Sequence, residues 1–210
     1  MPPLEAILFD FDGVLADTEP LHHACWAAAL APHGIDLDWP TYRDRCVGLS
    51  DADLVAFVAA RAGRESDCAR LWAEYPRKQE IFRQRILAEP PISPEVVGLL
   101  ESLGAYKLGL VSSTSRLELE PILRRAGIFD RFQTLVCAED VTRCKPQPEP
   151  YLLAAERLRV RYALVVEDSE AGLASGRAAG FEVLYIPEAR RMPELVCARL
   201  AAGASASGPR

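Results

Sequence analysis

Short apolar runs alternate with longer segments of helical periodicity along most of the chain. Five runs are apolar enough to form buried strands, at 4–9, 108–111, 135–136, 163–166 and 183–186. Apolar residues recur with helical spacing in the segments 94–103, 117–125, 151–159 and 171–179. This alternation is typical of an α/β fold, a parallel sheet covered by helices on both faces. Such sheets bind ligands beyond the carboxyl ends of their strands.

The stretch after the first strand has a different pattern. No run in it favours a strand, and helical segments are predicted at 20–31, 41–46, 51–62 and 67–88, the last interrupted near Pro76. We therefore predict a core domain formed by 1–17 and 89–200, with a helical domain, 18–88, inserted into it. The remaining residues, 201–210, are rich in Ala, Ser and Gly and are expected to form a disordered tail.

Composition narrows the classes of partner. A chain of 210 residues can bury one core and a small inserted domain. The formal net charge of −6 argues against nucleic acid and anionic membranes as partners. No apolar stretch approaches the roughly 18 residues that would span a bilayer. We expect a small-molecule partner and a monomer, with a dimer as the alternative.

The cellular location is predicted from the first residues and the cysteines. Met1, Pro2 and Pro3 lead directly into the first strand, so no signal peptide is expected. The 6 cysteines are scattered, without a CxxC pair or the Cys/His spacing of a zinc site. They are interpreted as reduced thiols, which predicts a cytoplasmic protein.

Asp10 and Asp12 follow the first buried strand, in the segment Leu8–Thr18. Two like charges held this close ionise together only when a cation or a basic group compensates them. A site with a nucleophile, an acid or base and a metal would explain the pair. A polar strand end that a loop exposes to solvent is the alternative interpretation.

Two further strand ends carry polar residues. Ser112 and Ser113 follow the second strand and lead into a helix, where hydroxyl and N–H groups suit a phosphate, although serine is also a common helix cap. Lys145 follows the third strand, and prolines stiffen its surroundings, so its ammonium is expected on a rigid loop. A solvated surface lysine is the alternative.

Glu167 and Asp168 end the fourth strand, which places a second acidic pair at the same edge of the sheet. One lysine cannot balance these carboxylates together with Asp10 and Asp12. A divalent cation can, and an all-oxygen ligand set favours Mg²⁺ over zinc. The alternative is that Asp168 or Ser169 caps the helix that follows.

These segments resemble the four motifs of the haloacid dehalogenase (HAD) superfamily. Asp10–Leu15, followed by Asp17 and Thr18, is similar to the first motif, and Ser112 to the second. Lys145-Pro146 resembles the third motif and Glu167–Gly172 the fourth, in the expected order. The resemblance covers nearly the whole chain and is to the C1-cap phosphatases and β-phosphoglucomutase-like members. It implies a Rossmann-like core with an inserted helical cap domain.

The resemblance also implies roles for the acidic residues. Asp10 would be the nucleophile that forms an aspartyl-phosphate, and Asp12 the general acid and base. Mg²⁺ would be bound by the Asp10 side chain, the Asp12 backbone carbonyl and Asp168. Glu167 would bind the metal directly or through water. Because dehalogenases and phosphonate-cleaving members lack the second Asp of the first motif, Asp12 favours phosphate esters.

Other positions would bind the substrate. By the same resemblance, Ser112, the backbone of Ser113, and Lys145 would bind the transferring phosphoryl group. His22 and Lys78 match cap residues of the β-phosphoglucomutase-like members, which makes both substrate-binding candidates. A half-buried histidine and a solvated helix face are their alternatives.

The cap loop 46–51 distinguishes between substrates. When the loop is aligned on Gly48, Val47 stands where a phosphoglucomutase has a lysine. Asp51 stands where it has the arginine that binds the distal phosphate. This favours a phosphatase for a small phosphomonoester, such as a sugar phosphate, a polyol phosphate or phosphoglycolate. A phosphosugar mutase is the alternative within the family, and a non-catalytic binding module on a HAD scaffold is the alternative from another class.

Overall fold

The computed structural model describes residues 3–47, 49 and 51–206, which divide into two compact units. The sheet unit consists of Met1–Asp17 and Pro90–Arg210, and the helical unit consists of Thr18–Glu89. The helical unit ends at Glu89, one residue beyond the end at 88 that the sequence predicts. Gly48 and Ser50, in the predicted cap loop, lie outside the described residues.

The sheet unit is built on five parallel strands. They are β1 (Ala6–Phe9), β2 (Lys107–Val111), β3 (Thr134–Val136), β4 (Ala163–Glu167) and β5 (Glu182–Tyr185). Their order in the sheet is β3-β2-β1-β4-β5. All residues of β1 and β4 are buried, as expected for central strands covered on both faces. The predicted α/β class is confirmed.

Strand β1 occupies the centre of the sheet. Leu8 pairs with Gly109 on β2 and with Val165 on β4. The chain leaves β1 for β2 and β3 on one side and then crosses back to form β4 on the other. Strand order therefore reverses at β1, and the carboxyl end of such a strand is the usual ligand site of an open α/β sheet.

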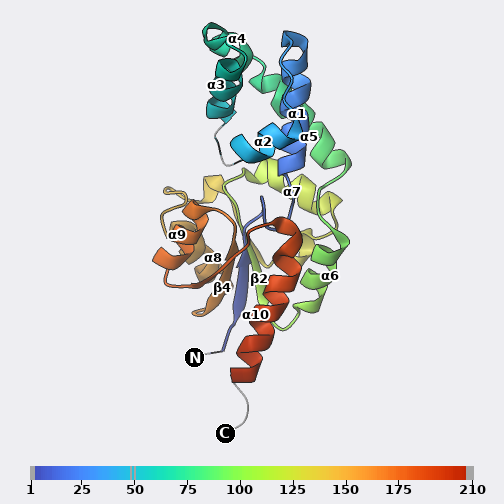
Figure 1. Cartoon of the computed structure of the whole chain (residues 1–210). Coiled ribbons are helices and arrows are strands. Elements are labelled where there is room, and N and C mark those ends of the chain that lie inside the picture. Colours follow the sequence, from blue (N-terminus) through green and yellow to red (C-terminus); the bar gives the residue numbers. More distant parts are fainter. Residues whose placement is uncertain (1–2, 48, 50, 207–210) are drawn as a thin grey trace. The chain divides into compact units, whose positions relative to one another are not determined.

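Helices cover both faces of this sheet. They are α6 (Pro94–Ser102), α7 (Arg116–Arg125), α8 (Glu149–Leu158), α9 (Glu170–Ala178) and α10 (Met192–Ala206), with short 3₁₀ turns η3 (Phe129–Arg131), η4 (Ala138–Asp140) and η5 (Ala189–Arg191). Figure 1 shows α8 and α9 on one face and α6 and α10 on the other. Among the described residues, no helix is both long and apolar enough to cross a membrane.

The predicted disordered tail is wrong for its first six residues. Helix α10 continues through Ala201 to Ala206. The alanines that make this segment resemble a low-complexity tail are also the strongest helix formers, so an existing helix propagates through them. Residues 207–210 lie outside the described part of the chain.

The helical unit contains no strand among its described residues. Its helices are α1 (Glu19–Leu30), α2 (Trp39–Arg45), α3 (Asp51–Arg61), α4 (Cys68–Trp72) and α5 (Tyr75–Ala88), with 3₁₀ turns η1 (Ala31–His33) and η2 (Glu65–Asp67). The break between α4 and α5 falls just before Pro76, where the sequence predicts an interruption. Trp26, Leu30 and Leu71 are fully buried in a core of their own.

Two helical glycines provide a matched test of packing in the sheet unit. A Cβ on Gly176 of α9 would lie 2.9 Å from Val183 Cγ2 and 3.0 Å from Val165 Cγ1, whereas a Cβ on Gly98 of α6 meets no atom within 4 Å. We expect Gly98→Ala to stabilise the protein by about 0.5–1 kcal/mol through helix propensity. Gly176→Ala should destabilise it by about 1–2 kcal/mol, because overpacking outweighs that gain. Urea unfolding measures both changes, and a stabilised Gly176→Ala would contradict the packing argument.

Candidate functional site

Two carboxylates come together because β1 and β4 are neighbours that end at the same level. Phe9 pairs with Val166, and the Asp10 N–H donates to the Val166 carbonyl at 3.0 Å. Asp10 and Glu167 therefore occupy matching positions at the carboxyl edge of the sheet. Oxygen atoms of Asp10, Glu167 and Asp168 all lie within 4.8 Å of one another. The sequence prediction that these residues meet at one edge agrees with this geometry.

A tight turn holds the loop after β1 close to Asp168. The Gly13 N–H donates to the Ala16 carbonyl at 2.9 Å, and Gly13 has a φ of +70°, which only glycine adopts without strain. A Cβ at Gly13 would lie 1.9 Å from Asp168 Oδ2. Glycine is therefore required here for backbone conformation and for the close approach. On the same loop, Asp12 accepts a 3.4 Å hydrogen bond from Thr114 Oγ1.

Lys145 joins three strand ends. Its Nζ donates to Asp10 Oδ1 at 2.6 Å, to Glu167 Oε1 at 2.6 Å and to the Val111 carbonyl at 3.0 Å. The side chain is only 8% exposed, so the surface-lysine alternative is wrong. Burial alone would lower the pKa of Lys145, but the carboxylates of Asp10 and Glu167 raise it above its ordinary value. The ammonium therefore stays charged.

Negative charge is in excess at this edge. Burial raises the pKa of Asp10 to about 8; Lys145 opposes this shift, while Glu167 and Asp12 add to it. Burial, followed by the charge of Glu167, raises the pKa of Asp168 to about 6. In both residues the neighbouring carboxylates add to the effect of burial, because four carboxylates face one ammonium. A bound divalent cation would relieve the excess, and a donor set made only of oxygens fits Mg²⁺.

Glu167 is fully buried, and hydrogen-bond donors surround it. Oε1 accepts from Lys145 Nζ and from Tyr151 OH at 2.8 Å. Oε2 accepts from the Asp168 N–H at 3.0 Å and from the N–H and hydroxyl of Ser169 at 3.2 and 3.0 Å. A carboxylate offers about four lone-pair sites, and five donors already address this one. These contacts favour Glu167 as the residue that orients Lys145.

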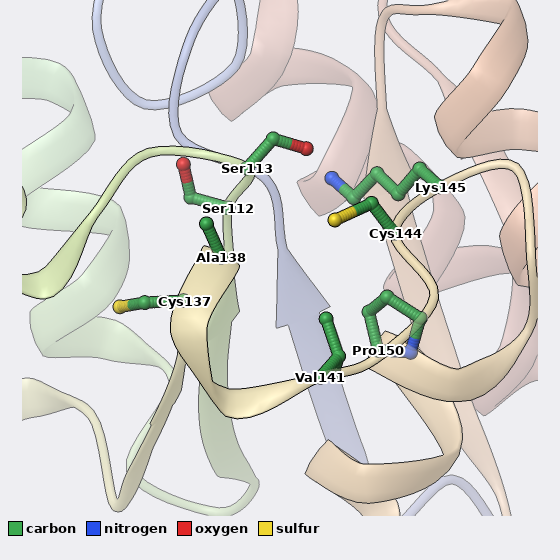
Figure 2. Close-up of a pocket in the computed structure, with 8 residues that line it drawn as sticks. All are labelled: Ser112, Ser113, Cys137, Ala138, Val141, Cys144, Lys145 and Pro150. Atoms are coloured by element: carbon green, nitrogen blue, oxygen red, sulfur yellow. The ribbon is translucent and has the colours of Figure 1, made fainter.

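Ser112 and Ser113 follow β2 at the same edge. The Ser112 N–H donates to the Val136 carbonyl at 2.9 Å, and its hydroxyl accepts from the Thr114 N–H at 3.0 Å. Ser112 is thus buried in a local turn, and Ser115 holds the N-cap position of α7 instead. In Figure 2 the Ser113 hydroxyl points toward the Lys145 ammonium. The pocket in that view is lined by Ser112, Ser113, Cys137, Ala138, Val141, Cys144, Lys145 and Pro150.

Some residues that hold the site were missed in the sequence. Tyr151 binds Glu167, and the buried Ser175 of α9 donates to the Gln147 carbonyl at 2.5 Å, which fixes the loop that carries Lys145. By contrast, the sequence offers Asp168 or Ser169 as the helix cap, and the cap is Ser169, whose hydroxyl accepts from the Gly172 N–H at 3.1 Å. Tyr151 and Ser175 lie on the inner faces of amphipathic helices, where the sequence gives no sign of a polar contact.

The helical unit contains the two candidate substrate residues, of which His22 is half-buried and Lys78 is buried. The Lys78 ammonium pairs with Asp51 at 3.0 Å, so the solvated-helix alternative is wrong. The rings of Trp26, Tyr75 and Phe82 surround it, with centroids 5.6, 5.8 and 5.7 Å away. His22 stacks on Phe82 with ring centroids 4.3 Å apart. Burial, with a smaller contribution from Lys78, lowers the pKa of His22 to about 4, so its ring is neutral at pH 7. Asp51 is the partner that sequence reasoning did not connect to Lys78.

Comparisons with a family model, with curated proteins and with solved structures all find proteins of one family. Residues 4–180 match the family model of haloacid dehalogenase-like hydrolases. N-acetylmuramic acid 6-phosphate phosphatase of Pseudomonas aeruginosa is 34% identical over 185 residues, 84% of this chain and 79% of that protein. Phosphorylated carbohydrates phosphatase of Thermotoga maritima is 32% identical over 188 residues, 87% and 84% of the two chains. Among solved structures, beta-phosphoglucomutase from Clostridium difficile superposes with a TM-score of 0.61 at 25% identity, covering 87% and 84%.

The excess charge predicts how pH and Mg²⁺ act together on stability. The pKa values of Asp10 and Asp168, about 8 and about 6, lie above the unfolded value of about 4. The folded state therefore binds more protons, and metal-free protein should lose stability as pH rises from 6 to 8. Mg²⁺ should raise the melting temperature more at pH 8 than at pH 6, because fewer protons compete with it. Differential scanning fluorimetry with Mg²⁺ or EDTA measures both trends.

Two variants that each remove one negative charge complete this experiment, one at the site and one away from it. Asp168→Asn should reduce the Mg²⁺-dependent rise at pH 8, whereas Asp130→Asn, at an exposed position on η3, should leave it unchanged. An equal Mg²⁺ effect at both pH values would contradict the assignment of a cation to this edge.

Proposed function

The chain belongs to the haloacid dehalogenase-like hydrolases, and from this premise we propose that it is a Mg²⁺-dependent phosphatase for a small phosphomonoester. It is an enzyme of the phosphoric monoester hydrolase type, as its relatives named as phosphatases indicate. The observation that carries the finer proposal is the Asp10 carboxylate, held 2.6 Å from Lys145 beside the oxygens of Asp168. An aspartate held in this way can act as a nucleophile toward phosphorus.

The reaction would consist of two displacements. In the first, an Asp10 oxygen attacks phosphorus while the bond from phosphorus to the leaving oxygen breaks, and Asp12 gives that oxygen its proton. In the second, Asp12 takes a proton from water, the water oxygen attacks the aspartyl-phosphate, and phosphate leaves with Asp10 restored. The Thr114 hydroxyl orients the Asp12 carboxyl for both transfers.

The neighbouring residues would bind the phosphoryl oxygens. Lys145 contributes a fixed positive charge, and the Ser112 hydroxyl and Ser113 contribute hydrogen bonds. Asp10, the Asp12 backbone carbonyl and Asp168 would hold Mg²⁺, with Glu167 binding it directly or through water. When bound, the metal supplies charge neutralisation at the transferring group.

The helical unit is proposed to be the cap, which recognises the leaving group and excludes water. His22 and Lys78 are its candidate substrate residues. Val47 and Asp51, at positions where a phosphoglucomutase has cations, favour a singly phosphorylated substrate. Sugar phosphates are supported by the names of the relatives, which include a phosphatase for phosphorylated carbohydrates. A phosphosugar mutase would retain phosphate on the sugar, and a binding module would do no chemistry.

Substitution of the proposed nucleophile tests the chemistry. Asp10→Asn should reduce phosphate release from sugar phosphates by at least about 10³-fold, because the amide cannot form the covalent intermediate. Phosphate release is measured with a panel of sugar phosphates, phosphoglycolate and p-nitrophenyl phosphate, in Mg²⁺ and in EDTA. Release that persists in EDTA or in the variant would contradict the proposal. Conversion of glucose 1-phosphate to glucose 6-phosphate without phosphate release would favour the mutase.

Asp12 can be tested separately because its two roles differ in their dependence on the leaving group. p-Nitrophenolate leaves without protonation, so Asp12→Asn should still transfer phosphate to Asp10 but hydrolyse the intermediate slowly. We expect a burst of p-nitrophenolate equal to the enzyme concentration, followed by turnover reduced about 10²–10⁴-fold. Stopped-flow absorbance measures the burst, and the wild-type enzyme is the control. A variant that lacks the burst but releases p-nitrophenolate at the wild-type rate would exclude Asp12 as the base.

A further inference from the structure

Tyr151 connects the hydrophobic core of the sheet unit to the charged edge of the sheet. Its side chain, on α8, is fully buried in a cluster with Val111 and Val165, so packing fixes the position of the ring. The hydroxyl donates to Glu167 Oε1 at 2.8 Å, and the ring centroid lies 5.2 Å from Lys145 Nζ. One side chain therefore contacts both members of the ion pair between Lys145 and Glu167.

Three protein acceptors hold the three N–H groups of the Lys145 ammonium. They are Asp10 Oδ1, Glu167 Oε1 and the Val111 carbonyl, at 2.6, 2.6 and 3.0 Å from Nζ. Because an ammonium has only three donors, a phosphoryl oxygen can bind Lys145 only if one of these contacts is released or shared. The cost of release depends on the donors that each acceptor keeps after the ammonium has left it.

Glu167 can release Lys145 at low cost. Its Oε1 keeps the hydroxyl of Tyr151, which is the donor because a carboxylate only accepts, and its Oε2 keeps three donors from Asp168 and Ser169. A buried carboxylate oxygen without any donor would be strongly destabilised, and the Tyr151 hydroxyl prevents this at Oε1. Release from Asp10 would instead remove the charge that compensates the proposed nucleophile.

We propose that Tyr151 is a positioning residue that allows Lys145 to turn one N–H from Glu167 to an oxygen of the transferring phosphoryl group. Lys145 keeps its contact with Asp10 during this change, so the nucleophile stays oriented. The inference rests on the proposed function and deepens it, because it explains how a fully paired cation becomes available to the substrate. Without the Tyr151 hydroxyl, Glu167 Oε1 would depend on Lys145 alone and would hold the ammonium back.

Tyr151→Phe tests this role because it removes the hydroxyl and keeps the ring in the core. We expect kcat/KM for p-nitrophenyl phosphate to fall at least about tenfold, as for a lost hydrogen bond to a charged group, and the inhibition constant of inorganic phosphate to rise by a similar factor. Both are measured with Mg²⁺ at a temperature where circular dichroism shows that the variant is folded. Tyr162→Phe, at a position 47% exposed in the sheet unit, is the matched control, and both constants should stay within about twofold of wild type.

A merely structural role for Tyr151 predicts a different result. Weaker packing lowers the melting temperature but leaves the kinetic constants of the folded enzyme unchanged. A folded Tyr151→Phe variant with wild-type kcat/KM and wild-type inhibition by phosphate would therefore overturn this inference alone. Absence of phosphate release from every compound by the wild-type enzyme would overturn the proposed function, and the inference with it.

A double variant shows whether Tyr151 acts through Lys145. Lys145→Met removes the ammonium, so adding Tyr151→Phe to it should change kcat/KM and the dissociation constant of inorganic phosphate by less than about twofold. Calorimetry measures the phosphate constant where turnover is too slow to follow. A further tenfold loss in the double variant would show that Tyr151 acts independently of Lys145 and would overturn the proposal. If Lys145→Met does not fold, Tyr151→Phe alone decides.

Discussion

The whole carboxyl edge of the sheet depends on how Lys145 compensates the charges around it. The ammonium binds Asp10 after β1, the last carbonyl of β2 and Glu167 at the end of β4, so one cation ties the three central strand ends together. One positive charge does not balance the carboxylates present. Burial, with a further contribution from Glu167 and Asp12, therefore raises the pKa of Asp10 to about 8 despite Lys145. A protonated aspartate is a poor nucleophile. A second cation at this edge is therefore a condition for the proposed chemistry at neutral pH, in addition to any role in binding phosphate.

Close packing creates this charge problem. The carboxylates are desolvated because backbone approaches them where a side chain would not fit: a Cβ at Gly13 would lie 1.9 Å from Asp168, and one at Gly172 would lie 1.7 Å from Glu167. Water excluded from these contacts no longer stabilises the ionised forms, so their pKa values shift. The glycines that permit the fold at this point therefore also make the site sensitive to a metal, since a cation restores what the lost water provided.

The sheet and its carboxyl edge were predictable because both follow from local patterns. A buried strand that ends in Asp10, or in Glu167 and Asp168, is visible in the sequence, and parallel strands bring such ends together. The hydrogen bonds of Tyr151 and Ser175 were not predictable. Each residue is a polar group on the inner face of a helix, and only tertiary packing brings it to its acceptor. The end of α10 at Ala206 was missed because an Ala-rich composition is shared by disordered tails and by the last turns of a helix that begins upstream.

Asp51 and Lys78 illustrate the same limit in the helical unit. Each alone resembles a surface charge, but as a buried pair they sum to zero, and only the carboxylate stays open to solvent. The sheet unit holds excess negative charge that requires a cation, whereas the charges of Asp51 and Lys78 cancel within the helical unit.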